Sequence, residues 1–290
     1  MATPGFAAAS ILPSSLPAPK PASPFLKWVG GKGRLLGQLE PLLPPGADLM
    51  RHVEPFFGGG ALFFRRMPER ALLCDVNPTL IRTYEAVRDD VGGVIRQLQK
   101  LAGRHSKERY YEVRARYNAK RLPTAEHAAT FIYLNKTCFN GLHRVNRRGE
   151  FNVPAGSYKN PRILDVDALY AASAALGRAE VRETGFEALL ESVRPGDFVY
   201  FDPPYAPVSE TANFTSYTQG GFGSAEQIKL RDVFCELDRR GAKLMLSNSD
   251  VPSIRALYAD YRIDTVSAPR AINCNADKRG AVSEVVVRNY

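Results

Sequence analysis

The sequence predicts an α/β fold, in which an open sheet of short strands alternates with helices, and three stretches carry this prediction. Phe198 to Phe201 is an aromatic and β-branched run typical of a buried strand, which the two prolines after Asp202 bring to an end. Leu49 to Glu54 is a second strand pattern, and it leads into a glycine-rich turn and a helical stretch. Ala71 to Asp75 is a third strand, followed by a helix that begins at Pro78. Strands that alternate with helices are characteristic of α/β domains.

Length and composition are those of a globular enzyme. The 290 residues, 44% of them hydrophobic, are enough to bury a full α/β core with room for an inserted subdomain. The formal net charge of +9 makes polyanions, and nucleic acid first among them, the leading class of partner. An ordinary basic enzyme is the alternative. The four cysteines lie far apart and form no Cys-x-x-Cys pair, so we expect reduced thiols in a cytoplasmic protein and no zinc site.

Residues 1–23 consist mostly of Ala, Pro and Ser, with Lys20 as the single charged side chain. Five prolines interrupt any helix here, and no apolar run approaches the ~20 residues of a membrane span. We expect a disordered leader that is neither a signal peptide nor a membrane anchor.

Ordered sequence is expected to begin at Pro24, and its first distinctive stretch is Trp28 to Arg34. Glycines on both sides of Lys32 allow the backbone to approach a ligand closely, and the lysine adds a cation. The Walker spacing is absent, so this stretch is not a P-loop. Trp28 is either a core residue or a stacking face for an adenine ring, and taken alone a core role is favoured.

The two strands that follow favour a cofactor without a phosphate. The turn after Glu54 has the sequence Pro-Phe-Phe-Gly-Gly-Gly, which lacks the Gly-x-Gly-x-x-Gly fingerprint of pyrophosphate binding. Asp75 ends the next strand at a position where a carboxylate commonly binds ribose hydroxyls. S-adenosylmethionine, with its adenine, ribose and sulfonium cation, fits both features. The alternative for Asp75 is a helix N-cap, a role that Asn77 could share.

Residues 91–136 have a helical period and a basic polar face, for which a solvated helical surface is the simpler interpretation. The loop that follows is more distinctive, because it combines asparagines with five cationic side chains: Arg144, Arg147, Arg148, Lys159 and Arg162. Arginine can bind guanine and asparagine can bind adenine in the major groove, while the remaining cations bind phosphates. A phosphate clamp without sequence preference is the alternative.

The tetrapeptide Asp202-Pro203-Pro204-Tyr205 carries the candidate chemistry. Each proline keeps the residue before it extended, so a carboxylate, the Pro203 carbonyl and an aromatic ring meet at the edge where open α/β sheets bind ligands. Two acceptors on the exocyclic amine of a nucleobase would free its lone pair to attack a methyl donor, while Tyr205 stacks on the base. A strand-ending turn with an ordinary acidic residue is an equal alternative for the tetrapeptide alone.

Taken together, the motifs resemble the Dam-type DNA adenine N6-methyltransferases, the alpha group of the D12 class. The resemblance spans about residues 24–290 and follows the family order. It rests on eight motifs: Lys27-Trp28 with Lys32, Glu54 to Gly60, Asp75 to Pro78, Cys138 to Pro154, Asp202 to Tyr205, Asn213 to Tyr217, Leu246 to Asp250, and Asp277 to Gly280.

This resemblance implies a Rossmann-like, seven-stranded sheet dependent on S-adenosylmethionine, with a helical target-recognition domain inserted after the second strand. The implied boundaries are 24–84 and 163–290 for the catalytic domain and 85–162 for the target-recognition domain. The implied reaction methylates the N6 amine of an adenine in double-stranded DNA, leaves S-adenosylhomocysteine and uses no metal. The implied protein is a nucleoid-associated monomer with a cognate restriction endonuclease as a candidate genetic partner.

Site residues follow from the resemblance position by position. The catalytic tetrapeptide is Asp202 to Tyr205. The cofactor site comprises Trp28, Lys32, Glu54, Phe56, Phe57, Gly58, Gly60, Asp75 and Asp202. The DNA-contacting set comprises Lys27, Phe139, Asn140, Leu142, Arg144, Asn146, Pro154, Ser157, Tyr158, Thr215 and Tyr217.

The resemblance also implies roles within these sets. Lys27 contacts the first guanine of the target, Phe139 and Asn140 fill the gap left by a flipped adenine, and Thr215 and Tyr217 close over the flipped base. Asp202, with an ordinary pKa near ~4, would orient the amine and could not deprotonate it before the attack.

One position departs from the family pattern. Members that methylate GATC carry an arginine that binds the last guanine, where this chain has Ser157. A bidentate arginine contributes ~1–3 kcal/mol of discrimination between bases. GATC is therefore one expected target, and another site that shares the GAT core is the alternative.

Two other classes of function stay open on the sequence. A methyltransferase acting on RNA or protein would use the same site, although glutamine methyltransferases typically have Asn-Pro-Pro-Tyr where this chain has Asp202. An inactive DNA-binding regulator would need a damaged cofactor or acceptor motif, and the sequence shows none.

Overall fold

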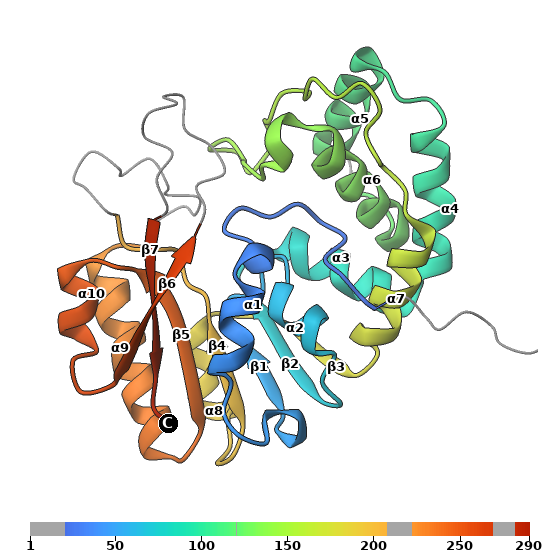
Figure 1. Cartoon of the computed structure of the whole chain (residues 1–290). Helices are drawn as coiled ribbons and strands as arrows, with labels where there is room; N and C mark the ends of the chain where they lie inside the picture. Colours follow the sequence, from blue (N-terminus) through green and yellow to red (C-terminus); the bar gives the residue numbers. More distant parts are fainter. Residues whose placement is uncertain (1–20, 120, 208–221, 269–281) are drawn as a thin grey trace, which may run out of the picture.

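The computed structural model describes residues 21–119, 121–207, 222–268 and 282–290, and a seven-stranded sheet lies at its centre (Figure 1). The strands are β1 (His52–Glu54), β2 (Ala71–Asp75), β3 (Ala179–Glu183), β4 (Phe198–Phe201), β5 (Lys243–Ser249), β6 (Arg262–Ala268) and β7 (Val282–Arg288). Their order is β3-β2-β1-β4-β5-β7-β6. Strand β7 pairs antiparallel with β5 and β6, and the other neighbours are parallel. The predicted Rossmann-like, seven-stranded fold is confirmed.

The helices connect these strands. They are α1 (Leu36–Leu39), α2 (Ala61–Arg66), α3 (Pro78–Asp89), α4 (Val91–Ala102), α5 (Lys107–Ala119), α6 (Thr124–Thr137), α7 (Val166–Leu176), α8 (Leu189–Ser192), α9 (Ser224–Arg239) and α10 (Pro252–Leu257). Short 3-10 turns occupy Lys32–Arg34, Glu40–Leu42, Ala47–Leu49, Phe139–Gly141 and Phe186–Ala188.

The expected strand from Leu49 to Glu54 is too long, and β1 begins only at His52. Ala47–Leu49 forms a 3-10 turn that Gly46 starts in the left-handed conformation, with φ at 74°. Leu49 is 87% exposed despite its apolar side chain, so hydrophobicity at this position does not indicate a buried strand. The strands predicted at Ala71 to Asp75 and Phe198 to Phe201 have the expected bounds.

Side chains alternate between the two faces of the sheet, as the two-residue period of a strand requires. In β4, Phe198 and Tyr200 face one apolar cluster, whereas Val199 and Phe201 face another, which helices α9 and α10 cover. All four side chains are buried, so this strand has apolar neighbours on both faces. That burial explains its continuous hydrophobic run in the sequence.

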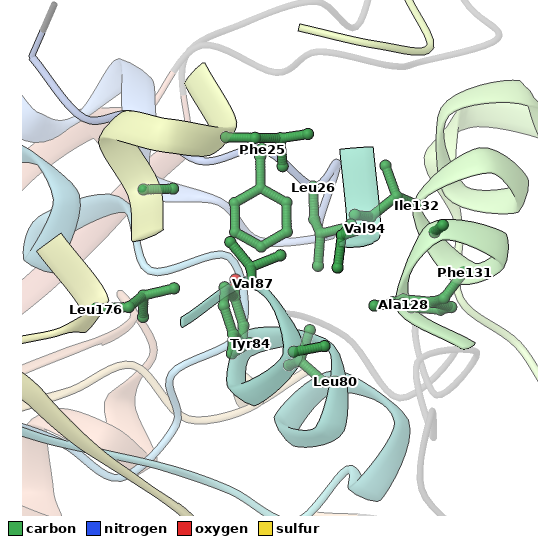
Figure 2. Close-up of a cluster of buried hydrophobic side chains, with 14 of the residues drawn as sticks. Phe25, Leu26, Leu80, Tyr84, Val87, Val94, Ala128, Phe131, Ile132 and Leu176 are labelled. Atoms are coloured by element: carbon green, nitrogen blue, oxygen red, sulfur yellow. The ribbon is translucent and has the colours of Figure 1, made fainter. Parts of the chain in front are cut away.

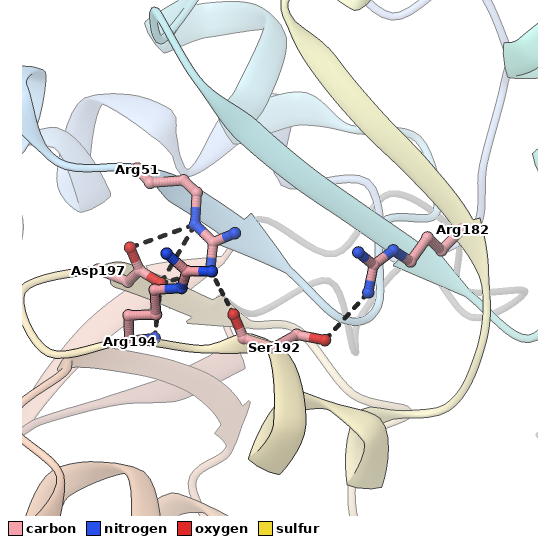
Figure 3. Close-up of polar contacts among 5 residues, drawn as sticks. All are labelled: Arg51, Arg182, Ser192, Arg194 and Asp197. Carbon is pink, nitrogen blue, oxygen red and sulfur yellow. Dashed lines mark hydrogen bonds and ion pairs between the residues drawn. The ribbon is translucent and has the colours of Figure 1, made fainter.

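An ion pair aligns β1 and β4 at their amino ends (Figure 3). Arg51 precedes β1 and donates from Nη2 to Asp197 Oδ2 over 2.6 Å, and Asp197 precedes β4. The same guanidinium donates to the carbonyl of Ser192 over 2.6 Å. Because His52 and Phe198 are then paired in register, the carboxyl ends of β1 and β4 are also brought level.

The chain between β2 and β3 forms a largely helical insertion, with α4, α5 and α6 beside the sheet layer (Figure 1). Figure 2 shows how Phe25 and Leu26 of the amino-terminal segment pack among side chains of α3, α4, α6 and α7. Ala22 already lies in this cluster, within the stretch assigned to the leader. Helix α3 is continuous across residue 84, where the domain boundary was expected.

Candidate active site

The candidate site lies where the sheet order reverses direction. From β1 the chain proceeds outward to β2 and β3, whereas from β4 it proceeds to β5 on the other side. Strand β1 ends at Glu54, and its neighbour β4 ends directly before Asp202. Strand β2 ends at Asp75. A crevice outside the carboxyl ends of strands at such a switch point is the usual ligand site of an open α/β sheet.

Asp202 is held by a buried lysine. Lys32 Nζ lies 2.6 Å from Asp202 Oδ1, and the two side chains are 7% and 21% exposed. The ammonium group also donates to the Gly30 carbonyl over 2.9 Å and lies 4.5 Å from the centre of the Tyr205 ring. The glycine-flanked lysine therefore belongs to the same site as the tetrapeptide. Within the described chain, no group donates a hydrogen bond to Asp202 Oδ2 or to the Pro203 carbonyl.

The ordinary pKa expected for Asp202 is wrong. Burial raises the pKa of this carboxyl to about 6, although the Lys32 cation opposes the rise. The acidic side chain Glu284 adds to it. At pH 7 the group is mainly a carboxylate, and it has a stronger affinity for a proton than an exposed aspartate.

The segment after Asp202 is clamped by β5 and α9. Gln227 Nε2 donates to the Pro204 carbonyl over 3.0 Å, and the backbone N–H of Ala206 donates to Asn248 Oδ1 over 3.0 Å. Asn248 is fully buried and donates to Gln227 Oε1, so the two amides form one network. The Tyr205 hydroxyl donates to Glu284 Oε2 over 2.7 Å. These bonds give the Leu246 to Asp250 motif a positioning role that the sequence did not reveal.

Asp75 closes the glycine-rich turn of residues 58–60. Its Oδ2 accepts from the Gly58 backbone N–H over 3.0 Å and its Oδ1 accepts from that of Asn77 over 2.9 Å. The N-cap of α3 is Asn77, whose side chain accepts from Leu80, so the cap role considered for Asp75 is wrong. Burial raises the pKa of Asp75, and the backbone donors oppose that rise.

The glycine turn allows Trp28 to lie directly on the backbone. Gly58 has φ at +48°, and a Cβ there would lie 2.8 Å from Trp28 Cδ1. Trp28 is only partly buried, at the edge of the first core cluster, so it is not the simple core residue that was favoured from its type alone. The part of its indole that stays exposed can contact a flat ligand.

Three of the expected cofactor residues also pack in or against the core beside the turn. Phe57 packs against Phe63, Phe64 and Tyr84, and Phe56 packs against Phe186 and Phe222. Glu54 is 3% exposed, and His52 Nε2 lies 2.7 Å from its Oε1. Arg66 can only donate to His52 Nδ1, so Nε2 carries the proton and donates to Glu54. Burial raises the pKa of Glu54 to about 8, which makes it a neutral acid at pH 7.

These groups fit a cofactor that carries a cation and no phosphate. Asp75 and Asp202 place acidic groups at the ends of β2 and β4, the two strands that flank β1, with an exposed part of Trp28 and the glycine turn beside them. Lys32, the cation of this set, is already paired with Asp202. A sulfonium group and ribose hydroxyls suit such a set better than a pyrophosphate would.

The loop after α6 folds back as a hairpin, residues 142–156, which the sequence analysis had treated as irregular. Val145 pairs with Phe151 across the hairpin, and Cys138 pairs with Ala155 at its base. Asn146 shapes the tip, because its Oδ1 accepts from the backbone N–H groups of Arg148 and Glu150. Its amide is thus occupied within the turn rather than free at the surface. Arg144 is exposed, and its Nε donates to Asn152 Oδ1 over 2.7 Å.

The remaining expected DNA contacts lie at or beside this hairpin. Phe139 is 50% exposed on the 3-10 turn before the hairpin, and Asn140 next to it has φ at 53°. Pro154, Ser157 and Tyr158 are exposed and Leu142 is half-buried. Thr215 and Tyr217 lie outside the described residues, as do the motifs from Asn213 to Tyr217 and from Asp277 to Gly280.

Lys27, next to Trp28 in the chain, contacts residues at the base of the hairpin. Its Nζ lies 4.0 Å from the centre of the Tyr158 ring and donates to the Lys136 carbonyl. Buried Asn135 accepts from the Lys27 backbone N–H and donates to the carbonyls of Lys27 and Gly141. The sequence does not indicate this role of Asn135, because its amide satisfies backbone groups from two segments that only the fold brings together.

Within the described residues, no group of three or more His, Cys, Asp or Glu side chains is arranged to bind a metal ion. No helix in the same residues combines the length and the hydropathy needed to cross a membrane.

Comparison with known proteins identifies relatives along most of the chain. Residues 28–272 match the model of the D12 class of N6 adenine-specific DNA methyltransferases. A type II methyltransferase of Methanocaldococcus jannaschii is 42% identical over 285 residues, covering 92% of this chain and 99% of that protein. The DNA adenine methylase of Vibrio cholerae is 37% identical, covering 90% and 94%, and that of Escherichia coli K12 is 34% identical, covering 90% and 93%.

Proposed function

The chain belongs to the D12 class of N6 adenine-specific DNA methyltransferases, and we propose that it transfers a methyl group from S-adenosylmethionine to an adenine flipped out of double-stranded DNA. One observation supports this proposal most directly. Asp202 Oδ2 and the Pro203 carbonyl, at the carboxyl end of β4, have no donor within the described residues. The contacts that hold this segment are made by other atoms, namely Asp202 Oδ1, the Pro204 carbonyl and the Ala206 N–H. Two free acceptors at a clamped strand end suit an amine that offers two hydrogens.

In this mechanism the protein positions and polarises the amine. Asp202 and the Pro203 carbonyl accept its two hydrogens, which draws the nitrogen toward tetrahedral geometry and frees its lone pair. Tyr205, whose hydroxyl is fixed by Glu284, provides the face on which the base stacks. S-adenosylmethionine supplies an electrophilic methyl group. The new bond joins N6 to that methyl carbon while the carbon–sulfur bond breaks, and the electron pair stays on sulfur.

The proton is lost after this attack. A carboxylate with a pKa of about 6 is far too weak a base to deprotonate a neutral exocyclic amine. Once N6 carries four bonds its proton is acidic, and Asp202 Oδ2 lies in position to accept it and pass it to water. The Lys32 cation keeps the carboxyl ionised before the reaction.

Residues 85–162 are proposed as the target-recognition domain. Exposed Phe139 and Asn140 would fill the stack when the adenine leaves it, at a cost of a few kcal/mol in lost stacking. Lys27, Leu142, Arg144, Pro154, Ser157 and Tyr158 would contact the bases from the hairpin side. Thr215 and Tyr217 are proposed to close over the flipped base. The proposed target is GATC or a site with the GAT core, and the proposed location is the nucleoid in the cytoplasm.

Transfer of labelled methyl groups tests this function. Purified protein is incubated with labelled S-adenosylmethionine and duplex DNA, RNA or protein, and methylation-sensitive sequencing then identifies the modified base and its context. We expect label on adenine N6 in duplex DNA alone. Asp202→Ala should abolish transfer and leave DNA binding within about threefold of the wild type. Label on RNA or protein, or full activity of Asp202→Ala, would contradict the proposal.

A further inference from the structure

His143 belongs to the hairpin and contacts the candidate cofactor site. Its ring stacks on the Trp28 indole, with centroids 5.6 Å apart and an interplanar angle of 22°. Its Nδ1 lies 3.3 Å from Asn77 Nδ2, and the Asn77 backbone in turn donates to Asp75. Through these contacts His143 touches two parts of the candidate cofactor site, the Trp28 indole and the turn that follows β2.

The same ring also contacts the proposed recognition domain. His143 packs edge-on against Phe131 of α6, with centroids 5.6 Å apart, and against Phe151 on the returning strand of the hairpin at 5.9 Å. Its chain neighbours, Leu142 and Arg144, are proposed base-contacting residues. A displacement of the ring would therefore shift both strands of the hairpin.

Two further observations show that the junction between Trp28 and His143 is tightly packed. Trp28 is confined between His143 and the glycine turn, where even a Cβ on Gly58 would meet the indole at 2.8 Å. Asn135 bonds the backbone of Lys27, next to Trp28, and the carbonyl of Gly141, two residues before His143. A tightly packed junction of this kind transmits a shift at one side to the other.

The chemistry of the ring suits stacking rather than charge. Burial lowers the pKa of His143 to about 4, so the imidazole is neutral at pH 7. A neutral Nδ1 accepts from the Asn77 amide, and the ring face remains free to stack on Trp28.

We propose that His143 is a positioning residue that couples cofactor binding to target recognition. The inference rests on the proposed function, because it takes Trp28 and Asp75 as cofactor contacts. A bound cofactor that holds the Trp28 indole in place also holds the His143 ring in place. The ring then stabilises the hairpin conformation that binds DNA. The coupling is reciprocal, so bound target DNA tightens cofactor binding by the same factor.

Fluorescence anisotropy with and without S-adenosylhomocysteine tests this inference. The probe is a labelled duplex that carries the sequence methylated by the wild type. We expect saturating S-adenosylhomocysteine to lower the Kd of the wild type for this duplex by about fivefold or more, within the usual range of coupling. In His143→Ala the two Kd values should agree within about twofold, while calorimetry shows S-adenosylhomocysteine alone still binding.

Matched variants separate coupling from simple packing. His143→Phe keeps a flat ring against Trp28 and should retain most of the coupling, whereas His143→Leu keeps bulk without the flat face and should lose it. His105→Ala, which removes a ring contact to Tyr133 within the helical insertion, should couple as the wild type does.

Each result decides the inference. Coupling as strong as that of the wild type in both His143→Ala and His143→Leu would overturn it. So would a wild type whose Kd for DNA is the same with and without S-adenosylhomocysteine. In either case methyl transfer by the wild type would leave the proposed function intact. A wild type that binds no S-adenosylhomocysteine at all would instead contradict the proposed function.

Discussion

Asp202 combines burial with an ion pair, and the balance between them determines how the site responds to pH. Burial favours the neutral acid and Lys32 favours the carboxylate, which leaves the pKa at about 6 rather than at the usual value of 3.8. Methyl transfer requires the carboxylate, because Asp202 Oδ2 must accept a hydrogen from the amine while Oδ1 stays paired with Lys32. The reactive form is therefore lost as pH falls through about 6.

The pH dependence of kcat/KM should reveal this balance. For the wild type we expect an acid limb with a midpoint near the free-enzyme pKa of about 6, below which activity falls about tenfold per pH unit. Glu284→Gln removes a neighbouring negative charge and keeps an acceptor for Tyr205, so its acid limb should move to lower pH. A wild-type midpoint near pH 4 would show that Asp202 is not shifted in solution.

Ser157 is the proposed contact to the last base pair of the target. It is exposed beside Tyr158, and a serine cannot form the bidentate contact that arginine makes with guanine. Ser157→Arg should raise discrimination for guanine at the last base pair by ~1–3 kcal/mol, about 5- to 150-fold in relative kcat/KM. Ser157→Lys is the control for added charge, and an equal effect of lysine would contradict a bidentate contact.

At the scale of elements, the glycine turn between β1 and α2 shapes the proposed cofactor site. Asp75 accepts from the Gly58 backbone N–H, Tyr84 donates its hydroxyl to the Gly58 carbonyl, and Trp28 lies on the remaining side. Gly58 is thus held on three sides in a left-handed conformation that other residues adopt at a cost of ~1–3 kcal/mol.

Gly58→Ala should therefore displace Trp28 and weaken cofactor binding. We expect at least a tenfold rise in the Kd for S-adenosylhomocysteine, measured by calorimetry, together with a loss of ~1–3 kcal/mol in the free energy of unfolding. Gly33→Ala is the matched control, because a Cβ at Gly33 meets no atom within 4 Å and the residue has no positive φ. Equal Kd values for the two variants would show that Trp28 does not depend on this turn.

Across the whole molecule, the sheet layer and the helical insertion share one apolar core. Phe25 packs against Phe64 of α2 and Tyr84 of α3, and Leu26 continues the same cluster toward α4 and α6 (Figure 2). The segment that carries Trp28 and Lys32 thus begins inside the core that the two parts share. A substitution in this shared core should destabilise both parts together.

Phe25→Ala tests that expectation. Phe25 is 4% exposed, and removal of its ring should lower the free energy of unfolding by ~3–5 kcal/mol. Far-ultraviolet circular dichroism and Trp28 fluorescence should still report one common transition in urea. Val29→Ala is the control, since Val29 is 50% exposed. Separate transitions in the wild type would show that the two parts unfold independently.

Much of the fold and the motif inventory was predictable from local sequence. The apolar run that forms β4 is ended by two prolines, and Pro78 begins α3, so these bounds depend on backbone chemistry that any context preserves. The start of β1 was predicted wrongly because Leu49 is apolar yet exposed, and exposure depends on distant neighbours.

The sequence by itself determined the sheet class, the family and the Asp-Pro-Pro-Tyr strand end, because turn chemistry and ordered motifs act over a few residues. Only the tertiary structure decided that Lys32 pairs with Asp202, that burial raises the Asp202 pKa to about 6, and that His143 of the hairpin stacks on Trp28. These contacts join residues far apart in the chain. Their distances and burial arise from the packing of the whole molecule, which no local pattern encodes.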